Sequence, residues 1–209
     1  MKKIMKTIWR LCVSVMLLMG LATNASAALI YDNGGPSTQN GYSILNSNVT
    51  ADDFSLTGTY DINSVGFYFQ NYQGISGWNQ DITYNFYNDN GGSLGSLIAT
   101  GSGQNVTPTD SGLPWCCGGG NAWLVTFNLE STLSLSSGGY WLGLTGATGT
   151  SNAWWVTTST GNGLINGSRI TYDFAYYLDG ELTSRSVPEP SSLALLALGF
   201  LGVKLARRI

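Results

Sequence analysis

Apolar and polar residues alternate in short runs along most of the chain, the pattern of β-strands that bury one face. In one such run, Val65, Phe67 and Phe69 share a face. The clear runs are residues 65–69, 82–86, 123–129, 140–144 and 171–178, and weaker runs lie at 29–31, 49–56, 97–101 and 153–157. Asn-Gly and Asp-Gly pairs, which tolerate the positive φ of tight turns, separate many of these runs. The pattern predicts about nine strands and no helix between residues 28 and 186.

The strand pattern extends from residue 28 to residue 182, a length that suits one domain with its own core. Many short, half-buried strands at this spacing favour an all-β fold, a two-sheet antiparallel β-sandwich of jelly-roll type. Residues 101–121 are rich in Gly, Pro and Ser, which predicts a long loop of the kind that often carries binding residues. Residues 183–186 predict a short linker.

Residues 1–27 have the three parts of a secretory signal peptide. Four basic residues precede the apolar run 11–22, namely Lys2, Lys3, Lys6 and Arg10. Ala25 and Ala27 are the small residues that signal peptidase requires, so we expect a signal helix, cleavage before Ala28 and export by a Sec-type route. The alternative is an uncleaved membrane helix, but the apolar run is shorter than the ~20 residues that span a bilayer.

Residues 187–209 combine an extended motif, an apolar helix and a basic end. The motif is Val187, Pro188, Glu189 and Pro190, in which the two prolines hold the chain extended for a processing enzyme. The uncharged run 193–203 predicts a hydrophobic helix. The basic end, Lys204, Arg207 and Arg208, is expected to stay cytoplasmic by the positive-inside rule.

In the order of its parts, this tail resembles the PEP-CTERM sorting signal of Gram-negative exported proteins. The resemblance implies recognition by exosortase, a membrane-embedded transpeptidase or protease, after transient anchoring in the inner membrane. It also implies a final place at the cell surface or in the extracellular matrix, associated with exopolysaccharide and biofilm. A second likeness covers residues 28–158, where YDNGG, ADDFSLTG, FYNDNGGSLGSLIATGSG and GGYWLGLTG are similar to β-sandwich ectodomains of PEP-CTERM proteins. That likeness implies a fold more than an activity.

The charge balance of residues 28–186 narrows the function. This segment has two basic residues, Arg169 and Arg185, against eleven acidic ones, and it has no lysine. Binding to phosphate depends on Lys and Arg, so nucleic acid and anionic lipid are excluded as partners, whereas divalent cations and neutral sugars are compatible. The chain has no histidine, which excludes Ser-His-Asp and Cys-His catalysis and imidazole zinc sites. The two glutamates of this segment form no spaced acid pair of glycosidase type, so we expect no enzyme.

Cys116 and Cys117 are neighbours and, once the leader is removed, the two cysteines that remain. Cysteines normally pair in an oxidising compartment, which favours a vicinal disulfide here. Adjacent Cα atoms lie at ~3.8 Å, below the usual 4.4–6.8 Å of a disulfide, so such a bond would be strained. Intermolecular bridges and free thiols remain the alternatives.

Acidic residues beside turn signals are candidate calcium ligands, because hard cations bind several oxygens. The candidates are Asp32, Asp52, Asp53 and Asp89, although none matches the EF-hand spacing. The alternative is that these residues serve turn geometry, which also requires Asn, Asp and Gly. We therefore expect no obligatory cofactor, with calcium as the candidate ion. Asp173 is predicted to point outward from its strand into solvent.

Seven tryptophans and eleven tyrosines suggest stacking against sugar rings. The candidate stacking residues are Trp78, Trp115, Trp141 and Trp155, and the alternative is that these rings form the sandwich core. The sequence thus predicts an exported, non-enzymatic surface or matrix protein. The alternative function is a lectin-like carbohydrate-binding module, assisted by calcium.

Overall fold

The computed structural model describes residues 27–37, 40–45, 47–71, 74–115, 120–149 and 152–183. Three predicted features lie outside these ranges: the signal helix with Ala25, the cysteine pair, and the sorting tail with the linker beyond Thr183. Of the predicted cleavage residues, Ala27 and Ala28 are described. In the described ranges, no helix has the length and apolar character needed to cross a bilayer.

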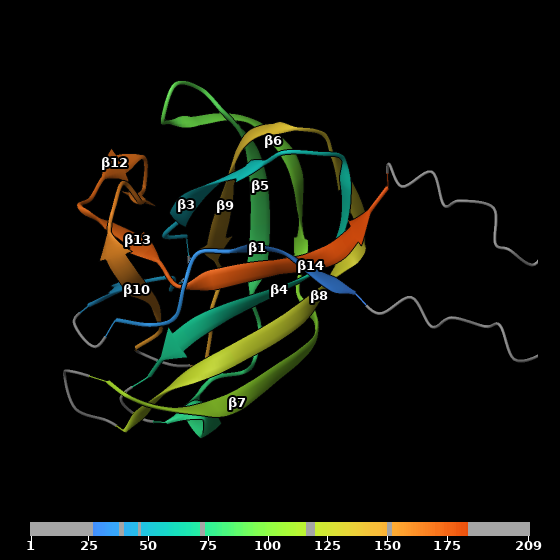
Figure 1. The fold of residues 1–209 in the computed structure, drawn as a ribbon. Helices are drawn as coiled ribbons and strands as arrows, with labels where there is room; N and C mark the ends of the chain where they lie inside the picture. The colour runs from blue at the N-terminus through green and yellow to red at the C-terminus, as the bar shows by residue number, and fades with distance from the viewer. Residues whose placement is uncertain are drawn as a thin grey trace, which may run out of the picture.

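The described chain is all-β and forms two antiparallel sheets, as predicted (Figure 1). The central strands of the first sheet follow the order β1 (Ala28–Asp32), β14 (Tyr176–Leu182), β4 (Tyr60–Gln70), β8 (Asn121–Leu135) and β7 (Gln104–Pro114). Beyond the start of β14, β4 also pairs with β10 (Trp154–Thr160), which in turn pairs with β2 (Gly41–Ser43) and β13 (Tyr172–Phe174). The one helical element of the described ranges is a 3₁₀ turn, η1 (Ile75–Gly77).

The second sheet has the order β12 (Ser168–Arg169), β11 (Leu164–Ile165), β3 (Thr50–Leu56), β9 (Gly138–Thr145), β5 (Thr83–Asp89) and β6 (Leu94–Ser102). Strand β11 is short and pairs with β3 only at Thr50 and Ala51. The edge of β3 beyond Ala51 therefore stays free on this side, and that free edge carries the site described below.

Aromatic side chains from both sheets fill the space between them. The residues of the predicted inward face, Val65, Phe67 and Phe69, are fully buried, which confirms the period-two prediction for β4. Across the interface, the ring of Phe127 on β8 stacks on that of Tyr84 on β5 with centroids 6.0 Å apart. Burial of each such side chain stabilises the fold by about 1.5–3 kcal/mol.

The predicted long loop at residues 101–121 is wrong, because most of it is strand β7, which pairs with β8 as a hairpin. The prediction failed because β7 is an edge strand with two exposed faces and thus no alternation of apolar residues. Pro108 and Pro114 also argued against a strand, although proline is tolerated at a sheet edge.

Candidate functional site

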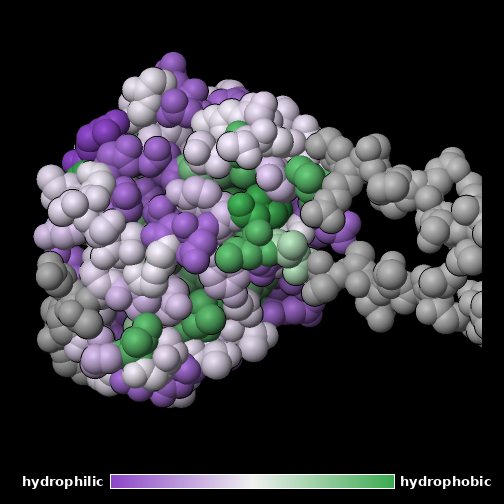
Figure 2. Space-filling view, in the orientation of Figure 1, coloured by the Kyte–Doolittle hydropathy of each residue, from purple (hydrophilic) through white to green (hydrophobic). Residues whose placement is uncertain are grey.

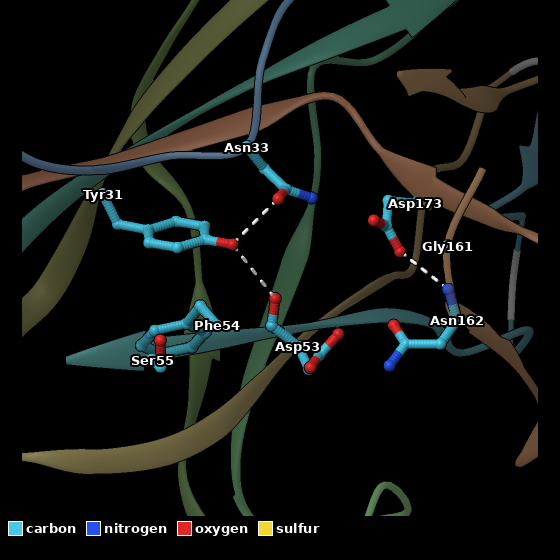
Figure 3. A pocket seen from close by; sticks show the side chains of 8 residues that line it. All are labelled: Tyr31, Asn33, Asp53, Phe54, Ser55, Gly161, Asn162 and Asp173. Atoms are coloured by element: carbon cyan, nitrogen blue, oxygen red, sulfur yellow. Dashed lines mark hydrogen bonds between the residues drawn. The ribbon is translucent and has the colours of Figure 1, made fainter. Parts of the chain in front are cut away.

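A polar pocket of about 400 Å³ lies where the free edge of β3 meets the first sheet (Figure 3). Its lining residues come from three parts of the chain: Tyr31 and Asn33; Asp53, Phe54 and Ser55; and Gly161, Asn162 and Asp173. The Asp53 carbonyl, on the unpaired edge of β3, accepts a hydrogen bond of 3.0 Å from the Tyr176 hydroxyl. The Tyr31 hydroxyl lies 3.5 Å from the same carbonyl and donates to Asn33 Oδ1 at 2.8 Å.

The loop at residues 161–163 is tied to β13 and its preceding turn by backbone hydrogen bonds. Gly161 N–H donates to the Thr171 carbonyl at 3.0 Å, and Gly163 N–H donates to the Tyr172 carbonyl at 2.9 Å. Gly161 is required because a Cβ atom there would lie 1.7 Å from Asp173 Oδ1. The close approach lets Asn162 N–H donate to that carboxylate at 2.8 Å.

Asp52 is a fully buried carboxyl group beside the pocket. Its oxygens accept hydrogen bonds from Phe174 N–H at 2.6 Å, from Asn33 Nδ2 at 2.7 Å and from Asp53 N–H at 3.1 Å. Burial raises the pKa of Asp52 to about 8, against the opposing effect of the Phe174 hydrogen bond. This carboxyl therefore holds its proton to a higher pH than an exposed aspartate, unless a cation replaces the proton.

Three carboxyl groups converge at this place. One oxygen each from Asp52, Asp53 and Asp173 lies within 4.8 Å of the others. Burial raises the pKa of Asp53. The Asn162 amide satisfies both carboxylates when its oxygen and nitrogen, as drawn in Figure 3, are exchanged: its nitrogen then donates to Asp53 Oδ1 at 2.6 Å and to Asp173 Oδ1 at 3.2 Å. Burial, together with the nearby acids, also raises the pKa of Tyr31 to about 12. The site therefore offers several oxygens and neutral hydroxyl groups, the ligand chemistry that Ca²⁺ prefers.

No basic side chain compensates these acids among the described residues. Arg169 is the one basic residue there, and it donates to the Gly92 carbonyl on another part of the second sheet. Carboxylates this close repel each other, so the cluster is stable only when it shares protons, hydrogen bonds or a cation.

Of the four acids predicted as calcium candidates, the structure brings together Asp52 and Asp53 but not the other two. Asp32 accepts a hydrogen bond from Gly34 N–H at 2.8 Å, and Asp89 accepts one from Gly92 N–H at 2.9 Å, both as turn residues. The third acid of the cluster is Asp173, and the expectation that it points into solvent is wrong. One feature of the sequence could have indicated a role for Asp173: acidic residues are depleted in β-strands, and Asp173 lies within a predicted strand.

All four tryptophans that were candidates for stacking on sugar rings are buried: Trp78, Trp115, Trp141 and Trp155. Trp78 stacks on Phe69 at 4.5 Å and Trp155 on Phe174 at 4.7 Å, so both belong to the core. Trp141 lies on the outer face of the second sheet, where Ala51, Leu164 and other apolar side chains cover it. Trp115 packs with Ala122 and Val156 on the first sheet.

Comparison with known proteins identifies the C-terminal segment. Residues 186–208 match the family model of the PEP-CTERM protein-sorting motif. No curated protein and no solved structure matches the chain. The motif implies processing by exosortase and export, with membrane-associated sorting toward the cell surface. The chain is thus identified, through residues 186–208, as a protein that carries a PEP-CTERM sorting signal.

Proposed function

We propose that this chain is a non-enzymatic β-sandwich protein that is exported by a Sec-type signal and displayed at the surface or in the matrix of a Gram-negative bacterium, in association with exopolysaccharide. The observation that carries the proposal is the sorting motif at residues 186–208. The passage of the chain between the sheets from β3 to β4 and again to β5 supports the jelly-roll type, in which consecutive strands often change sheet.

The site supports a binding rather than a catalytic role. Asp52, whose pKa is displaced most among the described acids, does not line the pocket. Asp53 and Asp173 do line it, but their carboxylate oxygens lie within 4.8 Å of each other and the Asn162 amide contacts both. Glycoside hydrolysis uses two carboxyl groups that act on opposite sides of a bond.

The experiment for the main proposal compares a native host with the same host lacking exosortase. We expect the surface form to begin at Ala28 and to have lost its C-terminal segment near Pro188–Pro190, and we expect the chain to remain membrane-bound without exosortase. Intact-mass measurement of the surface form and of the membrane-bound form identifies the first and last residue of each. A variant with Pro188→Ala and Pro190→Ala is expected to remain membrane-bound in the native host, as the unaltered chain does in the host lacking exosortase. A surface form that keeps Ile209 would contradict the proposal.

A second candidate function is a lectin-like module that binds a neutral glycan with the help of calcium. The convergence of Asp52, Asp53 and Asp173 beside a pocket with the Tyr31 hydroxyl favours it. A glycan array, run with calcium and with a chelator, tests this function directly. Asp173→Asn is expected to remove calcium-dependent binding, whereas Asp89→Asn, which alters a turn acid outside the cluster, is the matched control. Equal binding with and without chelator would exclude a role for calcium.

A further inference from the structure

The outer face of the first sheet is open and polar, and Figure 1 looks directly onto it. Direct cross-strand pairs place their side chains on one face, so the register defines rows across the five strands β1, β14, β4, β8 and β7. One row is Asp32, Tyr177, Gly66, Thr126 and Thr107. The next is Leu29, Asp179, Ser64, Asn128 and Gln104. Hydroxyl and amide groups thus occupy most positions of these two rows, and Figure 2 shows pale and purple residues on this face together with several green apolar ones.

The Tyr177 side chain crosses Gly66 of β4, and this close approach requires that Gly66 has no side chain. A Cβ atom at Gly66 would lie 2.2–2.6 Å from the Cζ, Cε1 and hydroxyl atoms of Tyr177. The Tyr177 side chain is half-buried, so part of it stays accessible to solvent. Packing over Gly66 restricts the ring before any ligand arrives, which lowers the entropy cost of binding. Burial, with Asp179 and Tyr68 close by, raises the pKa of Tyr177, so its hydroxyl stays neutral.

A second aromatic group follows along the same strand. Tyr68 is two residues from Gly66 on β4, on the same face and also half-buried. It packs against the cluster of Trp115, Ala122 and Val156. The Trp115 indole N–H of this cluster is buried and has no hydrogen-bond partner among the described residues.

Charge selects the class of ligand. The two rows carry two acids, Asp32 and Asp179, and no basic residue. Arg169, the basic residue of the described chain, belongs to β12 in the other sheet. Such a face repels nucleic acid, anionic lipid and acidic polysaccharide, whereas its hydroxyl, amide and carboxylate groups pair well with sugar hydroxyls. A flat aromatic ring fits the apolar C–H face of a pyranose.

We infer that the outer face of the first sheet, with Tyr177 and Tyr68 as stacking rings, binds an extended neutral polysaccharide. The polysaccharide lies across the strands, with its rings over the two tyrosines and its hydroxyl groups on Thr126, Asn128 and their neighbours. The inference rests on the proposed extracellular role, but it places glycan recognition on the sheet face rather than in the acidic pocket, and it requires no calcium.

The test is affinity electrophoresis of the full-length chain in a detergent without a sugar headgroup. The gels contain hydroxyethylcellulose, galactomannan or dextran as neutral probes, and alginate as the acidic probe. We expect at least one neutral polysaccharide to retard the chain, with and without chelator, and alginate to have no effect. Tyr177→Ala and Tyr68→Ala are each expected to weaken binding by at least about tenfold, as for an aromatic binding hot spot. Tyr177→Phe keeps the ring and is expected to retain binding.

Tyr87→Ala is the matched control, because Tyr87 is a half-buried tyrosine on the outer face of the other sheet. Thermal melting confirms that each variant is folded, and Tyr177→Phe keeps the test valid if an alanine variant does not fold. Retardation by no neutral polysaccharide, or equal retardation of wild type and both alanine variants, would overturn the inference. Since the assay uses unprocessed chain, its result is independent of exosortase, and a failure of sorting in the host would leave it unchanged.

Discussion

One strand, β3, serves two regions of opposite character. Phe54 belongs to the apolar core, where its ring lies 5.5 Å from that of Tyr140 and 6.1 Å from that of Phe86. Asp52, two residues earlier on the same strand face, is equally buried but lies among acids. The core gains stability from each apolar group removed from water, whereas a buried carboxyl loses stability when it ionises. The same strand therefore stabilises the domain at one end and carries, at the other, a buried carboxyl whose ionisation costs stability.

The largest expected effect is in the core. Phe127→Ala removes a side chain that is 1% exposed and contacts the rings of Phe67 and Tyr84. We expect a loss of about 3–5 kcal/mol in the free energy of unfolding, from lost burial and the cavity left behind. Urea denaturation followed by tryptophan fluorescence measures it. Asn128→Ala, at the exposed neighbour, is the control and should stay within about 0.5 kcal/mol. A small effect of Phe127→Ala would mean that the core is not the main source of stability.

The acidic region is expected to respond to pH in the opposite way from ordinary surface acids. The pKa of Asp52 is about 8 in the folded chain and 3.8 as the reference value. The folded state thus binds the proton more tightly, so the contribution of this group is complete below about pH 4 and is lost as the pH rises through 8. One pKa unit corresponds to about 1.4 kcal/mol. If half of the shift of the Asp52 pKa from 3.8 to about 8 is realised, the free energy of unfolding falls by about 3 kcal/mol as the pH rises.

Asp52→Asn isolates this effect, because the amide cannot ionise. We expect the difference in unfolding free energy between wild type and Asp52→Asn to shift in favour of the variant as the pH rises from 5 to 9. Urea titrations at several pH values, with chelator present, measure it. A difference that stays constant over this range would show that Asp52 titrates normally.

The sequence predicted the apolar half of this comparison well. Residues such as Phe67, Phe69 and Phe127 follow a period of two, and period two translates directly into one buried face. Strand β7 was missed because its residues are held by pairing with β8 rather than by burial of one face. The sequence likewise left open whether the four candidate tryptophans stack on sugars or are buried, since periodicity does not reveal which outward rings other segments will cover.

The acidic half could be predicted only in part. Asp52 and Asp53 are adjacent and draw attention by themselves, but Asp173 joins them across more than a hundred residues of chain. Its position depends on the loop at Gly161 and on where β13 lies against the free edge of β3. Sequence spacing contains no information on such a contact, which comes from the order of strands in two sheets.

Calcium is expected to reduce the difference in stability between the apolar core and the acidic region. An ion held by Asp52, Asp53 and Asp173 would replace the proton and stabilise the folded state by about 2.7 kcal/mol at a hundredfold excess over its dissociation constant. The melting temperature should therefore rise with calcium, more at pH 8 than at pH 5, where protons compete. Asp173→Asn should remove the rise, and Asp89→Asn should not. No rise at any pH would mean that protons and hydrogen bonds alone satisfy the cluster.

The smallest expected effect comes from an acid in the reverse situation. Asp89 is exposed and accepts a hydrogen bond of 2.8 Å from Trp141 Nε1, which lowers the pKa of this carboxyl. A carboxyl with a lowered pKa stabilises the fold at pH values above its reference pKa of 3.8. This contribution is lost as the pH falls through the pKa of Asp89 in the folded state. Because solvent screens the exposed group, and an amide oxygen can still accept from Trp141, Asp89→Asn should cost only about 0.5–1 kcal/mol. The cost should be complete at pH 7 and smaller at pH 3, the opposite trend to Asp52→Asn. Urea titrations of both variants at the two pH values measure it, and parallel trends would show that burial does not distinguish the two acids.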